Sequence, residues 1–95
     1  MKEIELVVGN RTGLHARPAR EFVNIARQFQ SDIRVSHGVK SANAKSLLSI
    51  LTLGVERGGT IRIQASGEDE EAALQALQAA VLGGLGEGAP GQGDN

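Results

Sequence analysis

The stretch Gly13-Leu14-His15-Ala16-Arg17-Pro18-Ala19 joins a segment with strand-like alternation to a segment with helical periodicity. Proline is tolerated in the first turn of a helix, where its missing N–H has no partner to lose. Pro18 therefore predicts a helix that begins at residues 15–17, with His15 at its N-terminal end. The unpaired backbone N–H groups of such an end attract anions.

The segments on both sides of this stretch have clear periodicity. Residues 2–8 alternate, which predicts a strand, and residues 9–13 are rich in glycine, which predicts a loop. After the junction the apolar positions repeat with helical spacing and predict a helix over residues 16–28. These positions are Ala19, Phe22, Val23, Ala26 and Phe29.

Five further elements and a turn complete the expected fold. A hairpin is predicted from strands at residues 33–36 and 40–44, joined by a turn at residues 37–40. Ser46 is suited to cap a short helix over residues 47–53, and residues 60–66 alternate as a strand. Asp69-Glu70-Glu71 caps and charges the start of a last helix, which Gly83-Gly84 ends. Its core positions are Leu74, Leu77 and Val81.

The order β-α-β-β-α-β-α indicates an α+β fold, with helices packed on one face of a mostly antiparallel sheet. A chain of 95 residues fits one domain with one modest core.

Composition excludes several classes of function. The chain has no cysteine, so disulfides and thiolate metal sites are excluded, and His15 and His37 make a poor metal set. A net charge of −1 and only two aromatic residues argue against nucleic-acid binding. No apolar run or signal sequence indicates membrane insertion or secretion. We expect a cytoplasmic protein without a cofactor or metal.

His15 and Arg17 together suggest phosphate chemistry. A histidine ring is a nucleophile that can accept a phosphoryl group, and a guanidinium pairs well with phosphate oxygens. The N–H groups of the first helical turn would face the same phosphate. The alternative interpretation is that His15 only caps the helix or lies on the surface.

The short helix at residues 47–53 is apolar almost all round. It cannot bury every face on so small a protein, so part of it should form an exposed contact surface. Its apolar residues are Leu47, Leu48, Ile50, Leu51 and Leu53.

The stretch from Gly13 to Ala19 resembles the phosphohistidine signature of HPr, the phosphocarrier family of the bacterial phosphoenolpyruvate:sugar phosphotransferase system. Lys45-Ser46-Leu47-Leu48 is similar to the regulatory serine segment of that family, and residues 65–70 provide a third match. The resemblance implies an HPr domain at residues 1–86. It also implies an open-faced β-sandwich, four antiparallel strands covered on one face by three helices. The composition of residues 87–95 predicts a flexible, Gly-rich tail.

The resemblance implies a phosphocarrier rather than an enzyme. His15 would accept a phosphoryl group on Nδ1 from phosphorylated Enzyme I and pass it to the IIA domain of a sugar permease. Arg17 would pair with the phosphate, the N–H groups of Ala16 and Arg17 would hold it, and Thr12 would lie beside it.

The resemblance also implies a docking surface made of Leu47, Leu48 and Leu51. Arg20 lies on that side, where family members usually carry Ala or Thr, so we expect it to affect the choice of partner. A monomer is expected.

In some family members a kinase phosphorylates the serine that corresponds to Ser46. The resemblance therefore suggests three further partners: a kinase, a phosphorylase and a catabolite-control transcription factor. The alternative is that Ser46 is an ordinary N-cap.

Two other functions stay open at this point. One is a regulatory or nitrogen-branch paralogue of the phosphotransferase system that acts mainly by binding other proteins. The other is an adaptor that binds peptides through the exposed leucines.

Overall fold

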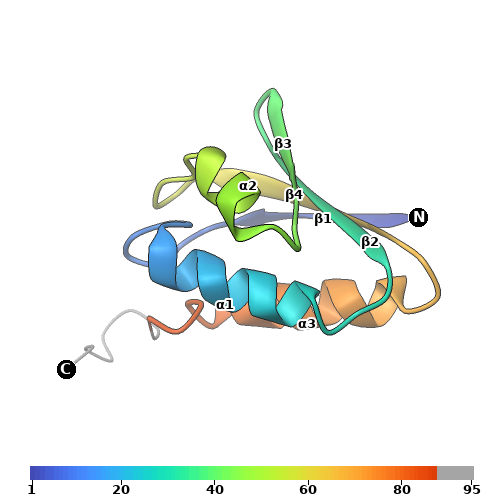
Figure 1. Ribbon diagram of the computed structural model, residues 1–95. Helices are drawn as coiled ribbons and strands as arrows, with labels where there is room; N and C mark the ends of the chain where they lie inside the picture. Colours follow the sequence, from blue (N-terminus) through green and yellow to red (C-terminus); the bar gives the residue numbers. More distant parts are fainter. Residues whose placement is uncertain (88–95) are drawn as a thin grey trace.

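The computed structural model describes residues 1–87, and the predicted order of elements is confirmed (Figure 1). The elements are β1 (Lys2–Val7), α1 (Ala16–Ala26), β2 (Asp32–His37), β3 (Lys40–Asn43), α2 (Leu47–Thr52), β4 (Thr60–Ser66) and α3 (Glu70–Leu82).

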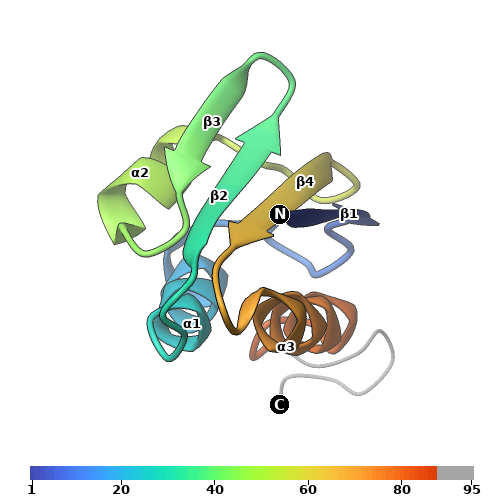
Figure 2. The same cartoon turned by 90° about the vertical axis from the view of Figure 1, so that its right-hand side faces the viewer.

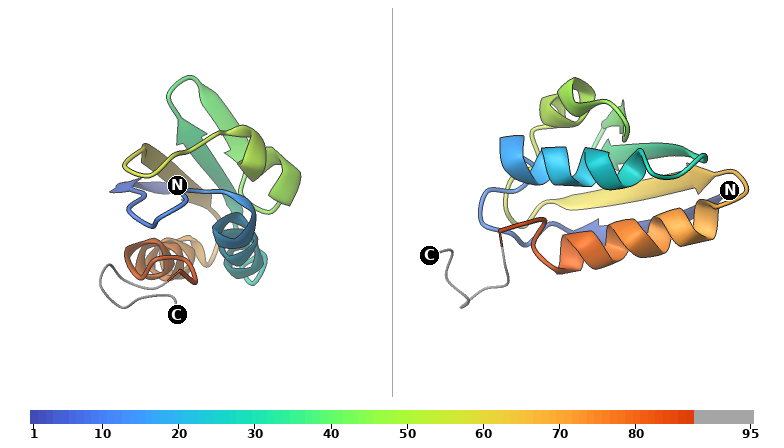
Figure 3. Two further views of the ribbon diagram at one scale, coloured as in Figure 1. Left: turned by 90° about the vertical axis from the view of Figure 1, so that its left-hand side faces the viewer. Right: turned by 60° about the horizontal axis from the view of Figure 1, so that its bottom comes forward.

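The four strands form one antiparallel sheet in the order β1-β4-β2-β3 (Figure 2). Alternation places Leu6 opposite Ile61 and Val35 opposite Ile63, and all four side chains are buried. Helices α1 and α3 lie side by side on this apolar face, and α2 contacts α1 and β3 (Figure 3). The arrangement confirms the predicted open-faced α+β sandwich.

The opposite face of the sheet is polar and carries cross-strand pairs. Gln64 donates a 3.0 Å hydrogen bond to Glu3, and Arg62 lies 3.6 Å from a carboxylate oxygen of Glu5. Because one face is apolar and the other charged, a shift of register by one residue would turn every core side chain toward water.

The predicted helical periodicity of α1 produces the centre of the core. Phe22 is fully buried, and the other buried positions lie on the same helical face. They are Pro18, Ala19, Val23 and Ala26.

Asp69 is the N-cap residue of α3, but its side chain does not cap that helix. Its carboxylate instead accepts hydrogen bonds from the N–H groups of Gln30 and Ser31, at 2.8 and 3.0 Å, and from the hydroxyl of Ser31. Glu70 accepts a hydrogen bond from the N–H of Gly67. The predicted cap is therefore replaced by a connection between the segment after α1 and the start of α3.

The hairpin turn is shorter than predicted. His37 and Lys40 are paired across β2 and β3, which leaves only Gly38 and Val39 between the strands. Nδ1 of His37 is 2.9 Å from the carbonyl oxygen of Thr60.

The buried position of Phe22 leads to a stability prediction. We expect Phe22→Ala to lower the free energy of unfolding by about 3–5 kcal/mol, because it removes a large side chain from the centre of the core. Leu48→Ala, a change at an α2 leucine that is 75% exposed, should cost less than about 0.5 kcal/mol. Denaturant unfolding measures both, and similar losses for the two variants would contradict the assignment of the core.

Candidate functional site

His15 is the N-cap residue of α1, as the position of Pro18 predicts. Its backbone is extended, with φ −84° and ψ −171°, and its carbonyl accepts the first helical hydrogen bond from Ala19 at 2.8 Å. Its side chain makes no capping hydrogen bond and is 57% exposed, whereas the preceding Leu14 is buried. The backbone is thus anchored while the ring is open to solvent.

Two of the residues predicted to hold a phosphate, Ala16 and Arg17, directly follow His15 at the start of α1. Within residues 1–87, the N–H groups of Ala16 and Arg17 donate no hydrogen bond. The Arg17 guanidinium is exposed and has no ion pair with the described residues. Their part in phosphate binding stays a prediction, but the start of α1 presents the donors it needs.

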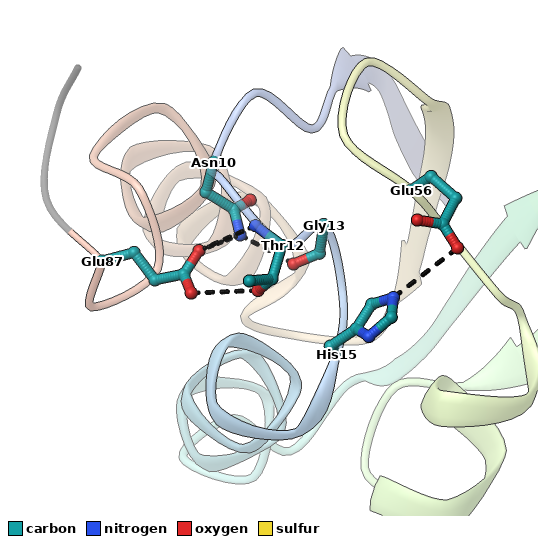
Figure 4. Close-up of polar contacts among 6 residues, drawn as sticks. All are labelled: Asn10, Thr12, Gly13, His15, Glu56 and Glu87. Atoms are coloured by element: carbon teal, nitrogen blue, oxygen red, sulfur yellow. Dashed lines mark hydrogen bonds and ion pairs between the residues drawn. The ribbon is translucent and has the colours of Figure 1, made fainter.

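The loop before His15 is held by Glu87. Asn10, which is buried, donates from its side-chain amide to the Gly13 carbonyl at 2.7 Å and to Glu87 at 2.9 Å. Thr12 donates to the same carboxylate from its N–H at 3.1 Å and from its hydroxyl at 2.9 Å (Figure 4). Both donors of Thr12 are therefore engaged, and its predicted contact with a phosphate would require an exchange of partners.

Glu87 is the first residue of the segment predicted as a tail. It is in contact with the loop that carries His15, and residues 88–95 lie outside the described residues. The hydrogen bond from the Asn10 side chain has the largest effect on the pKa of the Glu87 carboxyl, and it lowers this pKa. Together with the bonds from Thr12, it holds the pKa of Glu87 below its ordinary value of 4.5, against the opposing effect of partial burial.

A close backbone contact joins the His15 loop to the loop between α2 and β4. Gly13 has φ +68°, and a Cβ there would clash with the Val55 carbonyl oxygen and lie 2.8 Å from the carbonyl carbon of Glu56. The N–H of Leu14 donates to the same Val55 carbonyl at 3.0 Å. This contact brings Glu56 to the ring: its Oε2 lies 3.6 Å from Nε2 of His15 (Figure 4).

The predicted exposed leucines lie on α2, which runs alongside α1 toward His15. The segment before α2 contacts the segment that follows the C-terminal end of α1, because Lys45 Nζ donates to the Phe29 carbonyl. The loop after α2 reaches Gly13. Leu48 and Leu51 are exposed and Leu47 is half-buried, and these three side chains form the leucine patch.

Arg20 lies three residues after Arg17 and therefore on the same side of α1. It is exposed and makes no ion pair with residues 1–87. The structure leaves its predicted effect on partner choice untested.

Ser46 is the N-cap of α2, and its hydroxyl oxygen accepts a 3.3 Å hydrogen bond from the N–H of Ser49. The neighbouring Lys45 ammonium is directed to Phe29 rather than to Ser46. The interpretation of Ser46 as an N-cap is confirmed, and a regulatory role remains a separate prediction.

Sequence reasoning did not find Asn10, Glu56 or Glu87. Each acts through a contact with a residue distant in sequence or through the conformation of a loop, and none belongs to a periodic pattern. The only available signal in the sequence was the glycine at position 13, since a loop glycine before a helix often marks a close backbone approach.

Two general observations apply to residues 1–87. None of the helices there is long and apolar enough to cross a membrane. No group of three or more His, Cys, Asp and Glu side chains in this range is arranged to hold a metal ion.

The chain is similar to known phosphocarrier proteins. A family model described as the PTS HPr component phosphorylation site matches residues 2–82. The phosphocarrier protein HPr of Haemophilus influenzae is 45% identical over 80 residues, which are 84% of this chain and 92% of that relative. The crystal structure of HPr-C-His from Thermoanaerobacter tengcongensis has a TM-score of 0.90 and 44% identity, and the match covers 94% of this chain and 100% of that chain.

The multiphosphoryl transfer protein of Salmonella typhimurium is 49% identical over 88 residues. That match includes 90% of this chain but only 23% of the relative, so the chain corresponds to a minor part of that larger protein.

The Glu87 contacts lead to a prediction about pH. Because its folded pKa is below 4.5, Glu87 stabilises the fold above the unfolded pKa, and this contribution is lost as pH falls through the folded pKa. Glu87→Gln should therefore be less stable than wild type at pH 7, and the difference should shrink below about pH 4.5. Denaturant unfolding of both proteins measures the difference in their free energy of unfolding. The measurement should run from about pH 2.5 to about pH 7, so that it includes the range in which carboxylates titrate. A difference that does not change with pH would contradict it.

Proposed function

The chain belongs to the HPr family of phosphocarrier proteins of the phosphotransferase system, and we propose that it carries a phosphoryl group on Nδ1 of His15. The donor is phosphorylated Enzyme I and the acceptor is the IIA domain of a sugar permease. The observation that supports this most directly is the exposed His15 ring next to the N–H groups of Ala16 and Arg17, which donate to no group within residues 1–87.

The transfer needs few chemical steps from this chain. The lone pair of Nδ1 attacks phosphorus, the N–P bond forms, and the bond from phosphorus to the donor breaks with its electron pair left on the donor. The N–H groups at the start of α1 and the Arg17 guanidinium stabilise the negative oxygens. Passing the group to the acceptor reverses these events, so the chain is a carrier and has no independent turnover.

The leucine patch fits the predicted docking surface for both partners. Leu48 and Leu51 are exposed on α2, which runs toward His15, so a protein that covers them would also reach the ring. Arg20 adds a positive charge on the same side of α1 as Arg17. A partner with an acidic rim around an apolar centre would match this surface.

We further propose that Ser46 is a regulatory phosphorylation site, acted on by a kinase and a phosphorylase and read by a catabolite-control transcription factor. A phosphate on Ser46 would place negative charge immediately before the leucine patch, which weakens apolar docking. A regulatory or nitrogen-branch role through protein binding is the alternative function. An adaptor that binds peptides only through the leucine patch would not need the His15 arrangement. A cytoplasmic monomer remains our proposal for its location and state.

Labelling tests the phosphocarrier proposal. With phosphoenolpyruvate and Enzyme I, we expect one phosphoryl group that is labile to acid and stable to alkali, because a phosphoramidate breaks when its ring is protonated. The label should be absent from His15→Ala and retained by His37→Ala, the matched control at the other histidine. An unlabelled wild type, or label on His15→Ala, would rule out the proposal.

A second labelling experiment tests regulation at Ser46. With ATP and a kinase that modifies this serine in HPr proteins, we expect an acid-stable phosphate that Ser46→Ala lacks and Ser49→Ala keeps. Ser46→Ala should also lose about 1 kcal/mol of stability, because it removes the N-cap of α2. Acid-stable label on Ser46→Ala would show that the kinase modifies another residue.

A further inference from the structure

Glu56 is the carboxylate that lies within ion-pair distance of the His15 ring in the described part of the chain. Its Oε2 is 3.6 Å from Nε2 (Figure 4). Within residues 1–87, neither side chain has another hydrogen bond or ion pair that would hold it elsewhere. The contact involves Nε2, whereas the proposed phosphoryl acceptor is Nδ1. Glu56 therefore faces the ring nitrogen that the reaction leaves unmodified.

The backbone holds this arrangement in place. The Val55 carbonyl accepts a hydrogen bond from Leu14 N–H, and Gly13 lies against the backbone of Val55 and Glu56. Leu14 and Val55, which form this hydrogen bond, both have buried side chains. Leu14 precedes His15 and Val55 precedes Glu56, so the hydrogen bond between Leu14 and Val55 fixes the backbone positions from which both side chains extend.

A neutral histidine carries its proton on one ring nitrogen, and the hydrogen bond made by the other nitrogen decides which. An ionised carboxylate accepts hydrogen bonds and donates none. A carboxylate that faces Nε2 therefore favours the tautomer of the ring that carries its proton on Nε2. In that form Nδ1 holds a lone pair. We propose that Glu56 is a positioning residue that keeps His15 in the Nε2–H form with Nδ1 free to accept the phosphoryl group.

This inference rests on the proposed function, and it accounts for the position of the ring proton throughout the transfer. With Nε2–H already present, Nδ1 attacks phosphorus without first losing a proton, and the donor keeps the electron pair of its broken bond. The ring then carries a positive charge with its proton still on Nε2, beside the Glu56 carboxylate. When the acceptor attacks phosphorus, the N–P electron pair returns to Nδ1 and the neutral Nε2–H ring is restored.

The effect should be modest in the free protein and larger in the docked complex. At 3.6 Å the contact is longer than a hydrogen bond, and the side chains of His15 and Glu56 are 57% and 76% exposed. Exposed pairs contribute little, and hydrogen bonds of this kind often shorten only when a partner binds. A protein docked on the leucine patch would remove water from the pair and strengthen the attraction.

Nitrogen NMR of the His15 ring tests the proposal in the free protein, without any partner. Long-range proton–nitrogen correlations at a pH where the ring is neutral report the ratio of the Nε2–H to the Nδ1–H form. We expect Glu56→Gln to lower this ratio about two- to fivefold, the range for an exposed charge pair. Glu68→Gln is the matched control, because it removes the same charge from the exposed β4–α3 loop, at the opposite end of α1 from His15 (Figure 1).

Transfer kinetics with Enzyme I provide the second measurement. We expect Glu56→Gln to lower kcat about three- to tenfold with little change in KM, since a positioning role acts on the reacting ring and a docking role acts on binding. An unchanged ratio of ring forms, or a change confined to KM, would overturn the proposal while leaving the phosphocarrier function intact. A wild type that takes no label would instead refute the function itself.

Discussion

The contact of Gly13 and Leu14 with the backbone of Val55 is the constraint on which the site depends. It joins the segment before α1 to the loop after α2, although more than forty residues separate them in the sequence. Pro18 determines where α1 can begin, but this contact determines what lies opposite its first residue. A Cβ at position 13 would push the two loops apart, so the positive φ and the close approach both require glycine.

Burial and exposure are divided between neighbouring residues throughout the site. Leu14 and Pro18 are buried while His15, Ala16 and Arg17 between them are exposed, and on α2 the buried Ile50 lies between the exposed Leu48 and Leu51. Each functional side chain is thus held by a buried residue close to it in sequence. The arrangement limits the freedom of the backbone without taking reactive groups away from solvent or from partners.

The sequence was sufficient for those features that depend on local chemistry. The strand alternation, the start of α1 at Pro18, the Ser46 cap and the exposed leucines of α2 all follow from nearby residues, and the structure has each of them. The prediction that the Asp69 side chain caps α3 was wrong, because its carboxylate accepts hydrogen bonds from Gln30 and Ser31, which are distant in sequence, and none from its own helix. Glu56 and Glu87 could not be predicted for the same reason, since their partners are set by tertiary packing.

Two carboxylates near the histidine that we propose as the phosphoryl acceptor require a physical explanation, because the carboxylate charge repels phosphate. The charge of Glu87 is matched by donors from Asn10 and Thr12, so it acts mainly on the loop. Among residues 1–87, Glu56 has no such donors, and it faces the ring. There it would attract the positive charge that develops in the proposed phosphorylation and would repel the phosphate oxygens. Arg17 has the opposite effect on those oxygens. A carrier must bind its group firmly enough to accept it and loosely enough to release it, and the opposite charges of Glu56 and Arg17 would act in these two directions.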